Sequence, residues 1–345
     1  MRQHFVASTL AALSIVACSD SSSTEPDPLA TTDSIVVNAS QSTAFVRLGS
    51  PASVVTVTDA SASPEWDISL FATTVTLNGG AAGPASVSGY CVCARANATD
   101  DAIRAMTPVT ALPDFAGLTS AAIPSDGAFS QDQLTPAIAG WFSGAGASAA
   151  VVPNRAFIVR EGTTTAILAK VRITGLQQAS ATNAGQVSFE YAIQPAPGAA
   201  FGAPQTRTVD VRNGTVYFDL TSGTTSSATN WDLRFDGWAI RLNSGVSGSG
   251  SLGAIPETSR SFESIDAAYA ATAPPQAYRR DAFGGVFVQQ PWYRYNITGT
   301  DNQIWPTFNV YLVKRGSEVY KVQLIGYYGA AGEPRVITMR YARLR

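Results

Sequence analysis

Histidine is almost missing from this chain. The only one, His4, lies in an N-terminal segment that we expect to be cleaved, so the mature protein would contain none. Ser-His-Asp catalysis, Cys-His catalysis and histidine-based metal sites are therefore excluded. Cysteine is scarce as well, with three residues and no C-x-x-C motif, which argues against a structural zinc site.

Charge is also sparse. Charged residues make up 14% of the 345 residues, and the formal net charge is −2. A nucleic-acid-binding surface needs a basic surplus, which this chain lacks, so we expect no nucleic-acid partner. Apolar residues reach 45%, as in folded globular proteins, and the length suits two domains of ordinary size.

The first residues have the pattern of a lipoprotein signal peptide, predicted over 1–17. The apolar stretch from Phe5 to Ala17 has 13 residues, fewer than the roughly 20 that a membrane-spanning helix needs. It ends in a lipobox, Ile15-Val16-Ala17-Cys18. We expect Cys18 to be lipidated, with palmitate as a typical acyl chain. The alternative is an ordinary secretory signal followed by a chance cysteine.

A polar segment follows the lipobox at once. Residues 18–34 are rich in Ser, Thr and Pro and cannot bury enough apolar surface to fold, so we predict a disordered tether. Each buried acyl CH₂ contributes about 0.8 kcal/mol, which makes anchoring through several chains firm. The membrane is thus an expected partner through the lipid anchor.

The other two cysteines, Cys91 and Cys93, are separated by one residue. In a strand, residues i and i+2 lie ~7 Å apart, farther than the Cα atoms of most disulfides. We therefore expect two free thiols. A soft-metal or heme contact is the alternative for this pair.

Alternating polarity dominates the chain and predicts half-buried strands, as in Val54–Thr58 and Val216–Leu220. Helical periodicity is scarce, and its best case, Ser264–Ala271, spans about two turns. The last three strands are predicted near 308–315, 319–328 and 335–344, as an antiparallel meander. The fold class is thus all-β with few short helices.

Six blocks recur in the same order, offset by about 150–165 residues. Examples are Trp66-Asp67 with Trp231-Asp232, and Ala169–Ile173 with Tyr320–Leu324. The repeat predicts two tandem antiparallel β domains, over 35–200 and 205–345. A segment rich in Gly and Pro, 195–204, is the expected linker.

The repeated motifs have structural interpretations. Each Trp is expected to anchor a core, and each following Asp to cap a turn through its carboxylate. The glycine-rich runs 78–80 and 243–250 are expected to supply positive φ for tight turns. A phosphate-binding loop would need a helix straight after the glycines, and no convincing helix follows either run.

The second repeat resembles the HmuY family of all-β bacterial lipoproteins. The resemblance rests on the following segments: Trp231–Phe235, Arg241–Gly248, Trp292–Tyr295, Val310–Val313, Tyr320–Leu324, Tyr327-Tyr328 and Thr338–Tyr341. The first repeat looks like a diverged copy of the same unit. The resemblance implies a hand-like fold, attachment at the outer membrane, on the cell surface, and a ligand held between loops, which in the best-known members is heme.

This chain differs from the family at the positions expected to supply the iron ligands. The resemblance implies axial heme ligands on loops near 259–274 and 298–306, and neither loop contains His, Met or Cys. In the first repeat, Met106 lies in the counterpart of the first loop, whereas the second loop, near 143–153, offers no iron ligand. Met106 is otherwise interpreted as a gap filler in the core.

Two functions remain open at this stage. The first is a surface lipoprotein that binds heme or a related tetrapyrrole without His ligation. The alternative is a non-heme binding or scaffold lipoprotein that recognises a glycan, a peptide or a partner protein, supported by aromatic residues such as Trp238, Trp292 and Trp305. An enzyme is not expected, because no spacing selects a pair of carboxylates. The candidate ligand-binding residues are Met106, Cys91, Cys93, Tyr293 and Trp305, with heme as the candidate cofactor and no metal site.

Overall fold

The computed structural model describes residues 33–162 and 167–345. The predicted signal peptide and the lipidation site Cys18 lie outside the described residues, as does most of the tether predicted over 18–34. No helix in the described part of the chain is long and apolar enough to cross a membrane.

The chain forms antiparallel β-sheets with a few short helices, which confirms the predicted fold class. Two sheets have five strands each. The first runs in the order β1 (Asp33–Asn38), β24 (Pro334–Arg343), β23 (Glu318–Tyr328), β22 (Tyr311–Arg315) and β6 (Ser88–Cys91). The second runs in the order β13 (Gln205–Asp210), β12 (Gln186–Ile193), β11 (Leu168–Gln177), β10 (Ala156–Arg160) and β18 (Gly253–Glu257). The strands β22, β23 and β24 form the predicted C-terminal meander.

Smaller sheets complete the fold. One four-stranded sheet has the order β3 (Ser53–Val55), β2 (Ala44–Arg47), β4 (Ile68–Phe71), β5 (Thr74–Leu77). The other has the order β15 (Thr224–Thr225), β14 (Val216–Asp219), β16 (Leu233–Asp236), β17 (Ala239–Leu242). Three pairs are β7 (Gln133–Thr135) with β19 (Ala282–Gly284), β8 (Phe142–Ser143) with β9 (Ala150–Val151), and β20 (Tyr293–Tyr295) with β21 (Ile304–Pro306).

The helices are all short. The α-helices are α1 (Asp100–Arg104), α2 (Leu112–Ala116), α3 (Ala267–Ala270) and α4 (Val286–Gln289). Single 3₁₀ turns lie at Ser120–Ala122, Asp126–Ala128, Gly146–Ser148, Phe262–Ser264 and Pro275–Ala277. The predicted helix over 264–271 is thus a 3₁₀ turn followed by one turn of α-helix.

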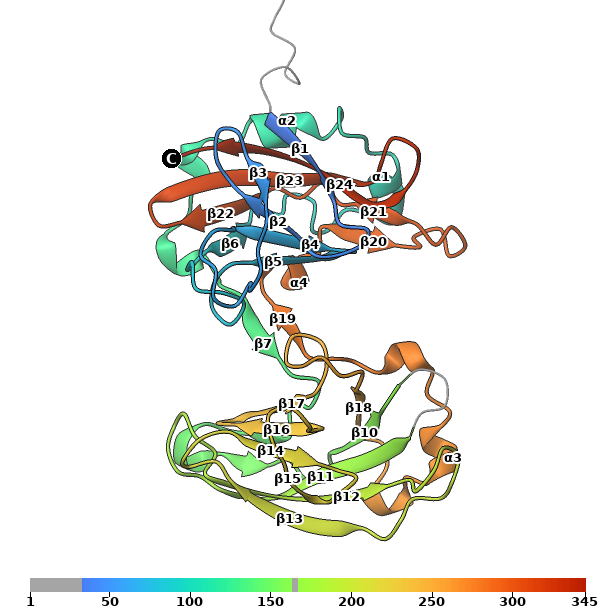
Figure 1. Cartoon of the computed structure of the whole chain (residues 1–345). Coiled ribbons are helices and arrows are strands. Elements are labelled where there is room, and N and C mark those ends of the chain that lie inside the picture. Colours follow the sequence, from blue (N-terminus) through green and yellow to red (C-terminus); the bar gives the residue numbers. More distant parts are fainter. Residues whose placement is uncertain (1–32, 163–166) are drawn as a thin grey trace, which may run out of the picture.

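The two structural bodies do not coincide with the two predicted domains, 35–200 and 205–345. Strand β1 pairs with β24, and β22 pairs with β6, so the first half of repeat one joins the second half of repeat two. Likewise β10 pairs with β18. Figure 1 shows the result: a terminal body made of 33–132, in blue to green, and 285–345, in orange to red, and an inserted body made of 136–281, in green to orange. The division into contiguous domains is therefore corrected to an exchanged pair.

Two buried lysines show the same exchange. Lys321 donates from Nζ to the carbonyl of Phe115 at 2.7 Å, and thus holds the helical segment of the other repeat. Its counterpart Lys170 donates to the carbonyls of Phe262 and Ile265, both at 2.8 Å. Each body therefore contains one half of each repeat, joined around its own buried apolar cluster.

The chain passes between the bodies at β7 and β19, which pair with each other as an antiparallel hinge (Figure 1). A buried aspartate precedes each strand. Asp132 accepts from the Leu77 amide at 2.8 Å, and Asp281 accepts from the amides of Leu242 and Ala137. These carboxylates fix each crossing strand to the half-repeat that it leaves.

The Trp-Asp motifs have the structural role that the sequence predicts. Trp66 and Trp231 are buried. The carboxylate of Asp67 accepts from the Leu48 amide at 2.7 Å, and that of Asp232 accepts from the Leu220 amide at 2.8 Å. Each Asp thus ties the turn after the neighbouring strand.

The expectation of free thiols at Cys91 and Cys93 is wrong, because the two residues form a disulfide. Strand β6 ends at Cys91, and Cys93 has a φ of 49°. The chain therefore turns within two residues and brings the Cα atoms to 5.0 Å, well below the spacing in a strand.

The exchanged topology predicts which fragments fold alone. We expect residues 136–281, expressed as one fragment, to unfold in a single cooperative transition, because the fragment contains its own sheets and core. Residues 205–345 should not fold, since β18 would lack β10 and β22 would lack β6. Circular dichroism during thermal melting checks both. Cooperative folding of 205–345 would contradict the exchange.

Candidate functional site

The loops expected to hold a ligand are rearranged by the exchange. Met106 follows α1, which lies against β21 of the other repeat and not against the 143–153 loop of its own repeat. Arg294 joins the two loops by an ion pair to Asp100 at 2.6 Å and a hydrogen bond to the Ala98 carbonyl. Met106 itself is half-buried beside this contact.

The other residues predicted to bind a ligand do not gather around Met106. Cys91 and Cys93 are joined as a disulfide, so they have no thiolate for iron. Tyr293 is half-buried and packs against the core of the terminal body. Trp305 is half-buried and donates from Nε1 to Asp301 at 2.9 Å. Among the described residues, no group of three or more His, Cys, Asp or Glu side chains could hold a metal ion.

A different set of aromatic side chains does gather around a cavity. This aromatic cleft, of about 680 Å³, is formed by Trp141, Phe142 and Trp238, together with residues 133, 134, 136 and 138–140, Asp236, Arg241 and Ala81. It lies where the hinge strand β7 enters the inserted body. The sequence pointed to Trp238 as an aromatic residue but gave no sign that Trp141 and Phe142 would join it.

The three rings of the cleft contact one another. The Trp141 and Trp238 rings are stacked, with centroids 6.2 Å apart and an interplanar angle of 25°. The Phe142 ring lies 4.6 Å from that of Trp238. Trp141 is almost fully buried, whereas Trp238 is only half-buried. Part of the Trp238 ring is therefore accessible to a ligand, and the buried Trp141 ring packs against it.

Asp236 and Arg241 form the polar edge of the cleft. Arg234 and Arg241 share the carboxylate of Asp236, at 2.9 and 3.0 Å, which leaves the three charges with a sum of +1. The Nε atoms of both arginines are buried without a hydrogen-bond partner. A ligand that presents a carboxylate to this edge would satisfy the excess positive charge.

The corresponding place in the terminal body is built differently. Strand register makes Thr73 the counterpart of Trp238, and Thr76 the counterpart of Arg241. Trp292, the counterpart of Trp141, donates from its ring to the Thr73 carbonyl at 2.9 Å. The aromatic cleft with its arginine edge is thus a feature of the inserted body and not of the shared fold.

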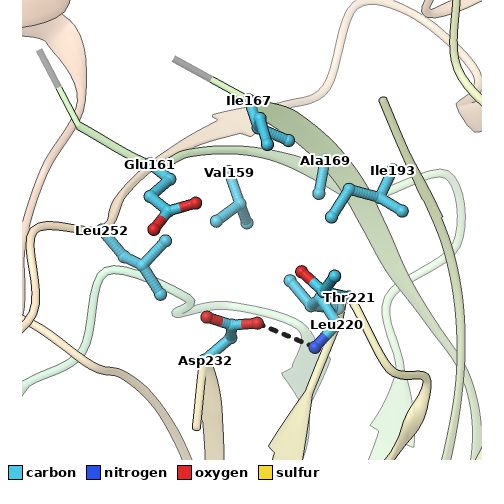
Figure 2. A pocket seen from close by; sticks show the side chains of 9 residues that line it. All are labelled: Val159, Glu161, Ile167, Ala169, Ile193, Leu220, Thr221, Asp232 and Leu252. Carbon is cyan, nitrogen blue, oxygen red and sulfur yellow. Dashed lines mark hydrogen bonds between the residues drawn. The ribbon is translucent and has the colours of Figure 1, made fainter. Parts of the chain in front are cut away.

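A second cavity, with room for about one water molecule, lies beside the Trp-Asp motif of the inserted body. Figure 2 shows the carboxylates of Asp232 and Glu161 directed into it. Burial, and to a smaller extent the nearby carboxylates of Asp219 and Glu161, raise the pKa of Asp232 to about 6, although the hydrogen bond from the Leu220 amide lowers it. Among the described residues, no Lys or Arg side chain forms an ion pair with Asp232.

In the terminal body the same position is charge-balanced. Asp67, the counterpart of Asp232, forms an ion pair with Arg315 at 2.7 Å and lies 3.8 Å from Arg47. The counterparts of these arginines are Glu161 and Asp219. The inserted body has thus replaced both cations by acids around the same turn-capping carboxylate. We interpret this cluster of acids as a source of pH-dependent stability and not as a catalytic site.

The raised pKa of Asp232 gives a signed prediction. An acid whose folded pKa exceeds its ordinary value stabilises the fold at low pH, and this stability is lost as pH rises from about 4 to about 6. Asp232→Asn should therefore raise stability at pH 8 by about 1–2 kcal/mol, after allowance for solvent screening, and change little at pH 4. Burial also raises the pKa of Asp67, but Arg315 and Arg47 oppose this, so Asp67→Asn should gain less stability at pH 8 than Asp232→Asn because it removes an ion pair. Thermal melts of both variants at the two pH values check this, and equal effects would contradict it.

Comparison with known proteins identifies the family. The HmuY protein family model matches residues 39–191 and 212–341, in agreement with the two sequence repeats. A solved structure from Bacteroides vulgatus, described as HmuY-like and heme-binding, aligns with 13% identity and a TM-score of 0.33, over 91% of this chain and 93% of that one. A lipoprotein structure from Bacteroides fragilis aligns with 14% identity and a TM-score of 0.14, over 45% of this chain and 88% of that one.

No curated protein matches. Both TM-scores lie below 0.5, so the assignment rests on the family model, which covers most of the chain in two successive segments. The chain belongs to the HmuY family and carries the family unit twice.

Proposed function

We propose that this protein is a lipid-anchored binding protein of the outer membrane surface that takes up a tetrapyrrole, such as heme, without axial ligation by protein side chains. Cys18 would carry the anchor. The observation that carries the proposal is the aromatic cleft, which combines a ring surface at Trp238 with positive charge at Arg241. A tetrapyrrole has the matching chemistry, a flat apolar ring with carboxylates at its edge.

The chain supplies ring contacts in place of iron ligands. The mature protein has no histidine, and Cys91 and Cys93 are oxidised. Stacked aromatic contacts contribute about 0.5–1.5 kcal/mol each beyond the burial of apolar area. A guanidinium paired with a carboxylate of the ligand adds orientation. In this mode the metal is not needed for binding.

The test is a comparison of hemin with metal-free protoporphyrin. We expect both to quench tryptophan fluorescence of the mature protein with similar affinity, because stacking does not involve the iron. Trp238→Ala should weaken binding of both about tenfold, as expected for a loss near 1.4 kcal/mol. Trp305→Ala, a half-buried tryptophan in the terminal body, is the matched control and should leave affinity unchanged.

Other outcomes have clear meanings. Binding of hemin but not of metal-free protoporphyrin would mean that iron is ligated, and Met106→Ala would then be the variant to measure. Absence of binding to either would overturn the proposal.

A glycan-binding function is the second candidate. Sugar rings also stack on exposed tryptophan, and the shared Asp236–Arg241 pair could hydrogen-bond hydroxyl groups. Quenching by oligosaccharides, lost in Trp238→Ala and without any response to porphyrins, would favour this function over the first.

A further inference from the structure

A second large cavity lies next to the aromatic cleft. Both cavities share residues 136, 139 and 140 as lining. This arginine cavity, of about 640 Å³, is lined by Arg155, Arg279, Arg280, Tyr278, Gln276 and the hinge segment around Pro136. Three arginine residues thus line one space at the junction between the bodies.

These three arginines do not form ion pairs with carboxylates in the described part of the chain. Within residues 33–162 and 167–345, none of them has an ion pair or a side-chain hydrogen bond. The Nε atom of the half-buried Arg155 is buried without an acceptor. By contrast, Arg172, Arg294 and Arg315 each have a carboxylate partner. Arg279 and Arg280 are exposed, and like charges that line one cavity repel one another unless an anion joins them.

The sister body shows that the fold does not need these charges. The strand register shows which residues of the two bodies correspond to each other. Ala254 pairs with Val159 in the inserted body, and Gly89 pairs with Val313 in the terminal body, so Ala254 corresponds to Gly89. The bridge between Ala254 and Arg279 corresponds to that between Gly89 and Ser130. By the same register, Arg280 corresponds to Gln131 and Arg155 corresponds to Asn309. The terminal body therefore builds the same framework with three neutral residues.

The backbone of the hinge segment also approaches one of these arginines closely. Gly140 has a φ of 69°, and a Cβ at this position would lie 2.7 Å from Nη1 of Arg155. Its counterpart before Trp292 is Pro291. A glycine thus leaves room for the guanidinium in the inserted body, whereas the terminal body has a proline there.

We propose that the arginine cavity is a binding site for a multivalent phosphate ligand, carried either by a soluble molecule or by a lipid headgroup. Guanidinium forks match phosphate oxygens with two parallel hydrogen bonds, and three of them suit an anion with more than one negative charge. The volume exceeds that of a single phosphate ion and leaves space for a second group. The site is distinct from the aromatic cleft and does not depend on porphyrin binding.

The test uses the full mature chain with Cys18→Ser, so that no lipid is attached. Pyrophosphate is titrated by calorimetry at low and physiological ionic strength. Separately, sedimentation measures binding to phosphatidylcholine vesicles with and without phosphatidic acid. We expect saturable binding in at least one arm, weaker at higher salt. Pyrophosphate binding indicates a soluble ligand, and binding to acidic vesicles alone indicates a headgroup.

The variants replace each arginine by the residue of the sister body. Each of Arg155→Asn, Arg279→Ser and Arg280→Gln should weaken binding roughly tenfold, as expected for loss of a charged hydrogen bond. The triple variant should bind neither probe. Its melting temperature should match or exceed that of the parent, because the repulsion is removed.

A charge-matched control carries Arg104→Asn, Arg212→Asn and Arg345→Asn, all at exposed positions away from the cavity. This control should keep the affinity of the parent for the probe that binds. No binding in either arm, or equal loss in the triple variant and in the control, would overturn the proposal. Porphyrin binding by the triple variant should be unchanged, which separates failure of this site from failure of the aromatic cleft.

Discussion

The antiparallel contact of β7 with β19 is the constraint on which the molecule depends. At this point the chain leaves one body and later returns, so that each body is assembled from halves of two repeats. The buried carboxylates of Asp132 and Asp281 hold the two crossing strands to backbone amides. The aromatic cleft and the arginine cavity lie against this crossing, because the segment that follows β7 forms a wall of each.

Comparison of the two bodies distinguishes the interactions that the fold requires from the positions that can vary. The turn-capping aspartates and the lysines that hold helical segments occur in both. Charges at other counterpart positions differ: Arg315 faces Asp67, whereas Glu161 faces Asp232. Backbone amides and carbonyls need the same partners in any copy of a fold. Side chains at the edges of cavities are under no such requirement, and there the inserted body has diverged toward aromatic and basic residues.

The candidate site could be predicted only in part. The sequence identified aromatic residues as the natural ligand contacts once histidine was excluded, and Trp238 was among them. It could not place Trp141 and Phe142 beside Trp238, because these residues are about a hundred positions apart and meet only through the exchange. It also gave the wrong state for Cys91 and Cys93, since a local turn with positive φ has no signature in the alternating pattern.

The sequence by itself determined the all-β class, the duplication and the structural role of the Trp-Asp motifs. These follow from residue type and period, which act locally. Only the tertiary structure decided which half of each repeat pairs with which. The two repeats offer nearly identical strand edges and apolar faces, so pairing within a repeat or between repeats satisfies the same hydrogen bonds and buries similar surfaces. The pairing between repeats depends on the path of the chain through β7 and β19. This pairing places the aromatic cleft and the arginine cavity beside these strands.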